Sequence, residues 1–277
     1  KARSLDYYWY SPVLKEQLED KRADVIVMPV TQDEVTRVAA AAARHAIPLT
    51  IRGGGTGNYG QCVPLEGGIV LDITGLKQII EIGDGWVRCE AGVRISRLDD
   101  ACNETGQQLL MYPSTRKMAT IGGFLSGGSG GIGSLRHGML RDDGNVRSLR
   151  IVTLEETPRI ITLEGPDIQK VHHAYGTNGI ITELELALQP AVEWHHAIAL
   201  FDDYADAVKF GEALCREDYD IYLISVVEKG FAQFYDKLSH VFPSNKHAVF
   251  SMVGPKTIDA FTADATSLGG QVSLMMS

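Results

Sequence analysis

The sequence lacks the long apolar runs and the basic clusters that mark several broad classes of protein. No apolar stretch approaches the roughly 20 residues that span a bilayer, and residues 1–4 are not followed by the apolar core of a signal peptide. Lysine and arginine total 26 against 35 aspartate and glutamate residues, so the net charge is −9 and no basic stretch suits nucleic acid. We therefore expect a cytoplasmic protein with no membrane span and no nucleic-acid partner.

Paired cysteines are missing as well. The four cysteines are scattered without a CxxC pair, which favours reduced core thiols over a disulfide framework or a zinc site. Adjacent histidines occur at 172–173 and 195–196, but neighbours on a strand point to opposite faces and cannot chelate one ion. We expect no metal site, and we expect these histidines to lie at the surface or in the core.

The 277 residues, 44% of them hydrophobic, suffice for one large domain or two smaller ones. Residues 24–29 and 49–52 are predicted strands on either side of a helix that opens at a Thr31–Glu34 capping box. This order predicts a parallel strand-helix-strand unit. The pattern further predicts strands at 68–73, 148–154, 159–163 and 179–188, a hairpin over 79–91 that turns at 83–85, and a helix over 98–105.

Beyond Pro190 glycine becomes rare and a second α+β unit is predicted. Its expected elements are strands at 197–201, 220–226 and 246–252 and helices at 204–215 and 257–268. Residues 271–276 look like a strand whose partner is expected beyond the last residue, so the chain looks truncated. We predict a cofactor domain over 1–190 and an incomplete substrate or cap domain over 191–277.

A glycine-rich loop follows the strand at 49–52 and matches the pattern GxGxxG over 55–60. A dinucleotide fingerprint of the Rossmann kind has to open a helix, yet Pro64 and the glycines at 67–68 forbid one. No Gly-Lys-Ser/Thr sequence supports a Walker A loop. The match therefore does not indicate a Rossmann fold. The loop is instead predicted to bring backbone N–H groups close to an anionic ligand. The alternative is a tight turn, for which one or two glycines would suffice.

A second glycine-rich stretch covers residues 120–142. It is too rich in glycine for an ordinary helix, because each helical glycine costs about 1 kcal/mol against alanine. A ligand bound close to the backbone would explain the many glycines. The alternative is a flexible linker, in which the apolar residues of this stretch would have no core to pack against. Within it, Arg136, His137 and Arg141 either serve a substrate or phosphate or simply rim the fold.

Several motifs in order resemble the FAD-binding domain of the vanillyl-alcohol-oxidase or PCMH family, and more closely its branch of 2-hydroxy-acid dehydrogenases and glycolate-oxidase-like subunits. The resemblance covers about residues 23–190. The motifs are RGGGTG at 52–57, EAG at 90–92, YPS at 112–114, TIGG at 120–123, GG at 130–131, HG at 137–138 with RD at 141–142, and GTNGIIT at 176–182.

The resemblance implies an α+β fold: a PCMH-type FAD-binding domain, with a small parallel strand-helix unit and a larger, mainly antiparallel sheet with helices, followed by a partial α+β cap. Residues 52–58 would wrap the FAD pyrophosphate, 113–114 and 120–129 would follow the ribityl chain and the isoalloxazine, and Ile180 would make a main-chain contact. The implied cofactor residues are Arg52, Gly53, Gly54, Gly55, Thr56, Gly57, Asn58, Pro113, Ser114, Thr120, Gly122, Gly123, Ser126, Gly127, Ser129 and Ile180.

Two departures from covalent members of the family predict that FAD is bound without a covalent bond. Those members carry a histidine in the first loop, where this chain has Gly55 and Thr56, and some add a cysteine near the second, where residues 116–118 hold none. Ser129 aligns with a position that influences oxygen access to the flavin in related oxidases.

The resemblance implies an FAD-linked oxidase or dehydrogenase that takes a hydride from the hydroxyl-bearing carbon of a small 2-hydroxy acid or alcohol. Two alternatives stay open: a flavin-binding electron-transfer subunit of a larger complex, and a reductase like the UDP-N-acetylmuramate-forming enzyme. The sequence assigns no catalytic base and no electron acceptor. It also leaves open whether the chain forms a homo-oligomer or joins a partner subunit.

Overall fold

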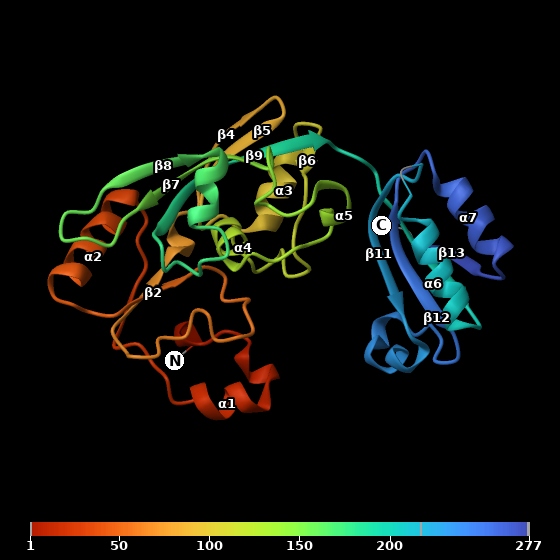
Figure 1. Cartoon of the computed structure of the whole chain (residues 1–277), viewed down its shortest axis with the longest axis horizontal. Coiled ribbons are helices and arrows are strands. Elements are labelled where there is room, and N and C mark those ends of the chain that lie inside the picture. Colours follow the sequence, from red (N-terminus) through yellow and green to blue (C-terminus); the bar gives the residue numbers. More distant parts are fainter. Residues whose placement is uncertain (1, 217, 276–277) are drawn as a thin grey trace. The chain divides into compact units, whose positions relative to one another are not determined.

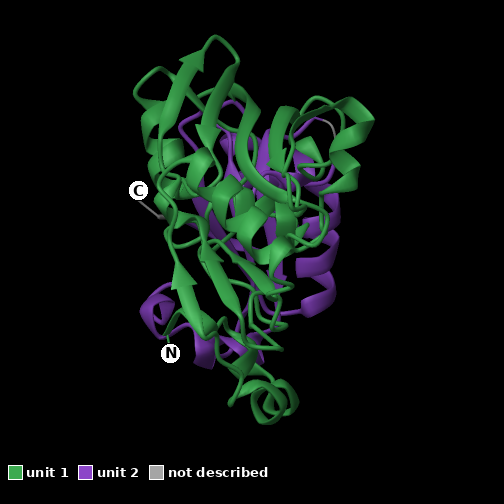
Figure 2. Cartoon of the chain, turned by 90° about the vertical axis from the view of Figure 1, so that its left-hand side faces the viewer, with its two compact units in different colours: residues 1–131, 137–191 green, residues 132–136, 192–277 purple. Residues whose placement is uncertain are grey.

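The computed structural model of the chain describes residues 2–216 and 218–275 (Figure 1). Backbone contacts divide the chain into two compact units, residues 1–131 with 137–191 and residues 132–136 with 192–277 (Figure 2). The short segment 132–136 belongs to the second unit although the first unit surrounds it in the sequence. That the units are a cofactor domain and a partial cap remains our proposal.

A small parallel sheet begins the first unit. Its strands lie in the order β1-β3-β2, and both β1 and β2 pair in parallel with β3. The helix α2 begins at the predicted capping box, where the Thr31 hydroxyl accepts a hydrogen bond from the Glu34 N–H at 3.2 Å. The predicted parallel unit is confirmed, with a third strand between the other two. These elements are β1 (Val25–Val27), α2 (Gln32–Arg44), β2 (Leu49–Arg52) and β3 (Ile69–Asp72).

A larger antiparallel sheet completes the first unit. Its order is β4-β5-β9-β7-β8, with β6 pairing against β9, and buried residues of both sheets share one core. Helix α3 begins at Ile95, before the predicted start, while α1 and β6 were not predicted. The elements are α1 (Pro12–Leu18), β4 (Ile79–Gly83), β5 (Trp86–Glu90), α3 (Ile95–Asn103), β6 (Gln107–Leu109), α4 (Ile121–Gly127), β7 (Val146–Val152), β8 (Ile160–Glu164) and β9 (Ile180–Pro190).

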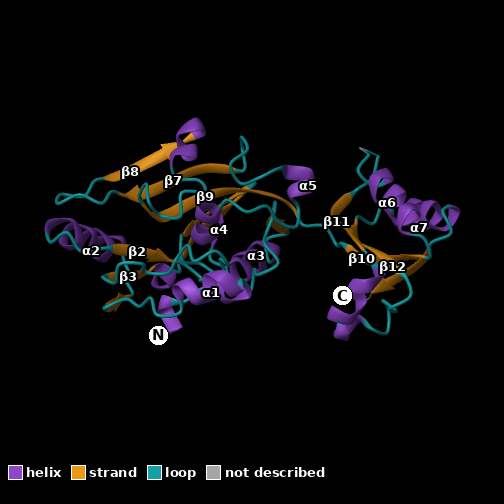
Figure 3. Ribbon diagram, turned by 60° about the horizontal axis from the view of Figure 1, so that its bottom comes forward, coloured by secondary structure: helices purple, strands orange, loops and turns teal. Residues whose placement is uncertain are grey.

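The second unit is an antiparallel sheet in the order β11-β12-β10-β13 with α6 and α7 on one face (Figure 3). The rings of Phe210 and Phe261 meet beneath these helices with their centroids 5.0 Å apart. The elements are β10 (His195–Phe201), α6 (Tyr204–Ala213), β11 (Ile221–Val227), β12 (His247–Val253), α7 (Ile258–Ser267), β13 (Gln271–Met275) and most of α5 (Ser134–His137), whose last residue belongs to the first unit.

One prediction about this second unit is wrong. We expected the partner of the last strand to lie beyond the end of the sequence, but β13 pairs antiparallel with β10 over residues 271–275. The alternation in the sequence revealed a strand and could not reveal that β10 presents a free edge to it. Met276, the last residue of the predicted strand, lies outside the described residues.

Two expectations about the class of protein can be compared with the structure. Within residues 2–216 and 218–275, we find no helix with the length and apolar character that crossing a bilayer requires. All four cysteines are free thiols. Cys62, Cys89 and Cys102 are buried as expected, whereas Cys215 is exposed.

Candidate functional site

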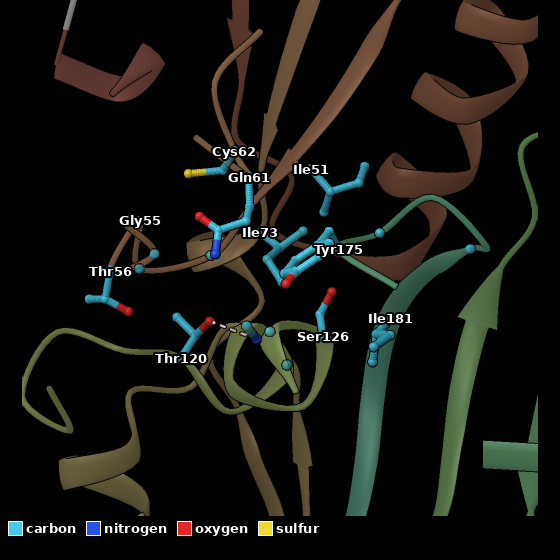
Figure 4. A pocket seen from close by; sticks show the side chains of 18 residues that line it. Ile51, Gly55, Thr56, Gln61, Cys62, Ile73, Thr120, Ser126, Tyr175 and Ile181 are labelled. Atoms are coloured by element: carbon cyan, nitrogen blue, oxygen red, sulfur yellow. Dashed lines mark hydrogen bonds between the residues drawn. The ribbon is translucent and has the colours of Figure 1, made fainter. Parts of the chain in front are cut away.

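The first glycine-rich loop borders an open pocket in the first unit, whose empty volume together with adjoining solvent is about 690 Å³ (Figure 4). Concave pockets with apolar walls and a few polar groups are typical of small-molecule and cofactor sites. The loop connects two parallel strands without a helix, as the sequence predicted. The residues that line the pocket are Ile51, Gly53, Gly54, Gly55, Thr56, Gly57, Gln61, Cys62, Ile73, Thr120, Gly122, Gly123, Ser126, Gly127, Tyr175, Gly176, Gly179 and Ile181.

The two glycine-rich stretches approach each other backbone to backbone. A Cβ placed on Gly53 would overlap the Thr120 hydroxyl oxygen, and one on Gly54 would overlap the Met118 carbonyl oxygen. A Cβ on Gly123 would lie 2.9 Å from the same Thr120 oxygen. Side chains would close this approach, so the glycines keep the main chain of both stretches within reach of one ligand.

Arg52, the last residue of β2, supports the first loop from behind. Its side chain is buried, and its Nη1 donates to the Leu5 carbonyl and contacts the Cys62 sulfur at 3.2 Å. Gly55 has a φ of +66°, and a Cβ there would overlap the Arg52 guanidinium. The loop therefore needs glycine at this position both for its left-handed backbone and for the arginine beneath it.

The backbone N–H groups of the first loop are available to a ligand. Among the described residues, none accepts a hydrogen bond from the N–H groups of residues 53–58. Unpaired backbone donors in a pocket cost free energy unless a ligand or water satisfies them. Successive loop N–H groups are a recurring binding site for phosphate oxygens.

The second glycine-rich stretch departs from our expectation, because residues 121–127 form a short helix, α4. The Thr120 hydroxyl caps it by accepting from the Gly123 N–H at 3.2 Å, and Gly128 ends it with a φ of +64°. Its glycines are tolerated because α4 packs closely, with Gly122 against Ala91. Figure 3 shows α4 below the larger sheet of the first unit.

The pocket carries little charge of its own. Among the described residues that line it, none is acidic or basic. Burial raises the pKa of the Cys62 thiol to about 11, so this side chain is neutral near pH 7. Burial also raises the pKa of the nearby Asp6 carboxyl. The loop N–H dipoles attract an anion, and the residues present fit the diphosphate of a dinucleotide cofactor.

The structure brings most of the predicted cofactor residues to this one pocket. Ten line it: Gly53, Gly54, Gly55, Thr56, Gly57, Thr120, Gly122, Gly123, Ser126 and Gly127. The other six do not: Arg52 lies behind the loop, Asn58, Ser114 and Ser129 are exposed, Ile180 is buried between two lining residues, and Pro113 lies near Gly131.

Sequence reasoning missed eight lining residues. Gly176, Gly179 and Ile181 belong to the motif at 176–182 that we quoted, and that motif was the available signal. The other five gave no signal, because distant segments of the chain bring them together: Ile51, Gln61, Cys62, Ile73 and Tyr175.

The basic residues of the second stretch lie outside the lining set. The Arg136 guanidinium forms an ion pair with Asp220 inside the second unit, which is a structural role. Arg141 lies 4.0 Å from the Asp142 carboxylate and is about half exposed. Neither arginine is assigned to a substrate by these contacts.

Comparisons with known proteins agree with this geometry. The model of a family described as "FAD binding domain" matches residues 23–162, about half of the chain. The D-lactate dehydrogenase of Archaeoglobus fulgidus is 30% identical over 226 residues, which cover 78% of this chain and 50% of that protein. The glycolate oxidase subunit GlcD of Bacillus subtilis is 30% identical over 194 residues, which cover 66% of this chain and 41% of that protein.

A third relative, the D-2-hydroxyglutarate dehydrogenase of Escherichia coli, is 36% identical over 47% of this chain and 13% of its own length. The solved structure of an alkyldihydroxyacetonephosphate synthase superposes with a TM-score of 0.76 at 20% identity, covering 91% of this chain and 55% of that one. That likeness shows the fold. The chain spans about half of the length of the relatives it matches, or less.

Proposed function

Since the chain belongs to the family of FAD binding domains, the PCMH-type flavoproteins that its motifs resemble, we propose that it oxidises a small 2-hydroxy acid with FAD as the hydride acceptor. FAD is the cofactor of this family. The observation that carries the proposal is the glycine-lined pocket whose unpaired N–H groups at residues 53–58 suit a diphosphate.

The substrate class comes from the names of the relatives. D-Lactate, glycolate and D-2-hydroxyglutarate each carry a hydroxyl on the carbon next to a carboxylate. When bound, FAD supplies an acceptor for the hydride that leaves this carbon. We propose that the D enantiomers are preferred where the acid is chiral.

The residues of the chain bind and orient the cofactor. Main-chain donors of residues 53–58 hold the diphosphate, with the buried Arg52 charge behind them. Gly122 and Gly123 of α4 lie close to the first loop, where the absence of Cβ atoms leaves room for the ligand. Cys62 stays a neutral thiol beside the pocket, and the proposed site holds FAD without a covalent bond.

Anaerobic mixing tests the reaction. The chain is reconstituted with FAD, and loss of the flavin absorbance is followed after addition of D-lactate, glycolate or D-2-hydroxyglutarate. L-Lactate and L-2-hydroxyglutarate serve as matched controls. Bleaching by at least one D acid or by glycolate is expected. If the flavin stays oxidised with every acid but is bleached by NADPH, the proposal is wrong. That result would favour a reductase like the UDP-N-acetylmuramate-forming enzyme.

A second candidate follows from one name, because the Bacillus relative is a subunit of glycolate oxidase. In that case the chain passes electrons to a partner protein. Steady-state turnover with a soluble artificial acceptor distinguishes the two. Rapid bleaching without turnover would indicate that a partner is needed to reoxidise the flavin.

A further inference from the structure

His173 and Tyr175 form a hydrogen-bonded pair beside the cofactor pocket. The His173 Nε2 lies 2.7 Å from the Tyr175 hydroxyl, and their rings meet edge to face with centroids 5.1 Å apart. Tyr175 lines the pocket, whereas His173 lies behind it against Gly128. The pair is thus arranged so that one ring faces the ligand and the other fixes its orientation.

The backbone that presents this pair is strained. His173 has a φ of +53° and Tyr175 a φ of +50°, which are left-handed values that residues with a side chain rarely adopt. Two hydrogen bonds anchor the segment to the end of α4, from the His173 N–H to the Leu125 carbonyl and from the Tyr175 N–H to the Ser126 carbonyl. Strain of this kind persists where the surroundings over-determine it, and it clusters at ligand sites.

Tyr175 lies at the apolar side of the pocket. Figure 4 shows its ring among Ile51, Ile73 and Ile181, with Thr56 and Thr120 on the opposite side. Ile73 and Ile181 are 3% and 5% exposed, so the core of the first unit backs this side of the pocket, while the Tyr175 ring stands at its outer edge. A ring bound there would rest between the apolar core and Tyr175.

We propose that Tyr175 is the wall against which the adenine ring of FAD stacks, and that His173 is the positioning residue that holds the tyrosine ring in place. The loop N–H groups occupy the side of the pocket suited to the diphosphate, which leaves one ring on each side of it. The flavin has to meet a substrate, and the adenine does not, so the apolar side that is backed by the core of the first unit receives the adenine. Aromatic side chains stack on purine rings with useful affinity.

The test measures ligand affinity in the full chain, with three probes: FAD, ADP and FMN, which lacks the adenine. Tyr175→Ala is expected to weaken FAD and ADP about 10-fold or more while FMN affinity stays the same. Tyr175→Phe keeps the ring and should stay within about 3-fold of the parent. Equal loss for FMN and FAD, or no loss of FAD affinity, would overturn the proposal.

His173→Asn tests the positioning role, because asparagine tolerates a left-handed backbone but cannot reach the tyrosine hydroxyl. It should weaken FAD binding about as much as Tyr175→Phe does, within about 3-fold, and change nothing further in the Tyr175→Phe background. An equal loss in both backgrounds would indicate a merely structural histidine and refute the pairing.

A matched control is Tyr204→Ala in the second unit. Tyr204 is 43% exposed against 38% for Tyr175, and its ring lies 5.2 Å from that of His247. Its replacement should leave all three affinities unchanged. The inference rests on FAD binding and not on the proposed oxidation, so a chain that binds FAD but oxidises no hydroxy acid would leave it intact.

Discussion

Replacing Gly55 by alanine tests whether the first loop and Arg52 form one packed unit. The new Cβ would occupy a backbone with a φ of +66° and would overlap the Arg52 guanidinium. The guanidinium has little freedom to move, because it is buried and bonded to the Leu5 carbonyl. We expect the variant to be destabilised in the absence of FAD and to bind FAD more weakly.

The magnitude follows from two contributions to the free energy of unfolding. A left-handed alanine costs about 1–2 kcal/mol, and displacing a hydrogen bond from a charged group costs about 1.5–3 kcal/mol. Their sum predicts a loss of about 2.5–5 kcal/mol for Gly55→Ala. Gly85, at the turn of the β4–β5 hairpin, has a φ of +75° and no atom within 4 Å of an added Cβ. Gly85→Ala should therefore lower the free energy of unfolding only by the cost of a left-handed alanine, about 1–2 kcal/mol.

Urea unfolding of the apoprotein measures both losses, and a titration with FAD measures the affinity. If Gly55→Ala and Gly85→Ala lower the free energy of unfolding equally, the contact with Arg52 does not contribute to stability. The prediction is then wrong. A double-mutant cycle with Arg52→Met gives a second check, since removing the guanidinium should recover part of the Gly55→Ala loss.

Three further outcomes are expected. Acid precipitation should release all FAD into the supernatant, and flavin retained by the pellet would show a covalent bond. A thiol reagent should modify one cysteine rapidly in the native protein, and Cys215→Ser should abolish that phase, because Cys215 is exposed while Cys62 is buried with a pKa of about 11. Burial raises the pKa of the Asp99 carboxyl above its usual value of 3.8 despite the ion pair with Arg116. The protonated carboxyl therefore adds fully to the free energy of unfolding below pH 3.8, and this contribution is lost as the pH rises through the raised pKa. Urea unfolding from pH 3.5 to 7 should show this decline in the parent and not in Asp99→Asn; a pH-independent difference between them would contradict it.

The strands and the first loop could be predicted from the sequence because their signals are local. Alternation marks residues 179–188, and a proline with paired glycines rules out a helix after the first loop. The helix α4 could not be predicted, because glycine propensity alone argues against it. It forms through tertiary contacts, chiefly the Thr120 cap and the close packing of Gly122 on Ala91.

The pocket was predicted in part for the same reason. Glycine-rich motifs indicate where two backbones approach closely, and ten of the residues predicted from these motifs line the pocket. The apolar side was missed because Ile51 lies in β2, Ile181 in β9 and Ile73 just after β3, and the sequence does not reveal how these strands pair. Tyr175 was missed because its placement depends on a left-handed turn at two residues that are not glycine.

The membership of residues 132–136 in the second unit has a consequence for dissecting the protein into fragments. The polypeptide passes between the units after residues 131, 136 and 191, so one cut cannot separate them. A fragment that begins at residue 192 leaves Asp220 without its ion pair with Arg136. Protein nicked by a protease near residue 191 should remain associated under native conditions, and a fragment meant to isolate the second unit has to carry residues 132–136 as well as 192–277.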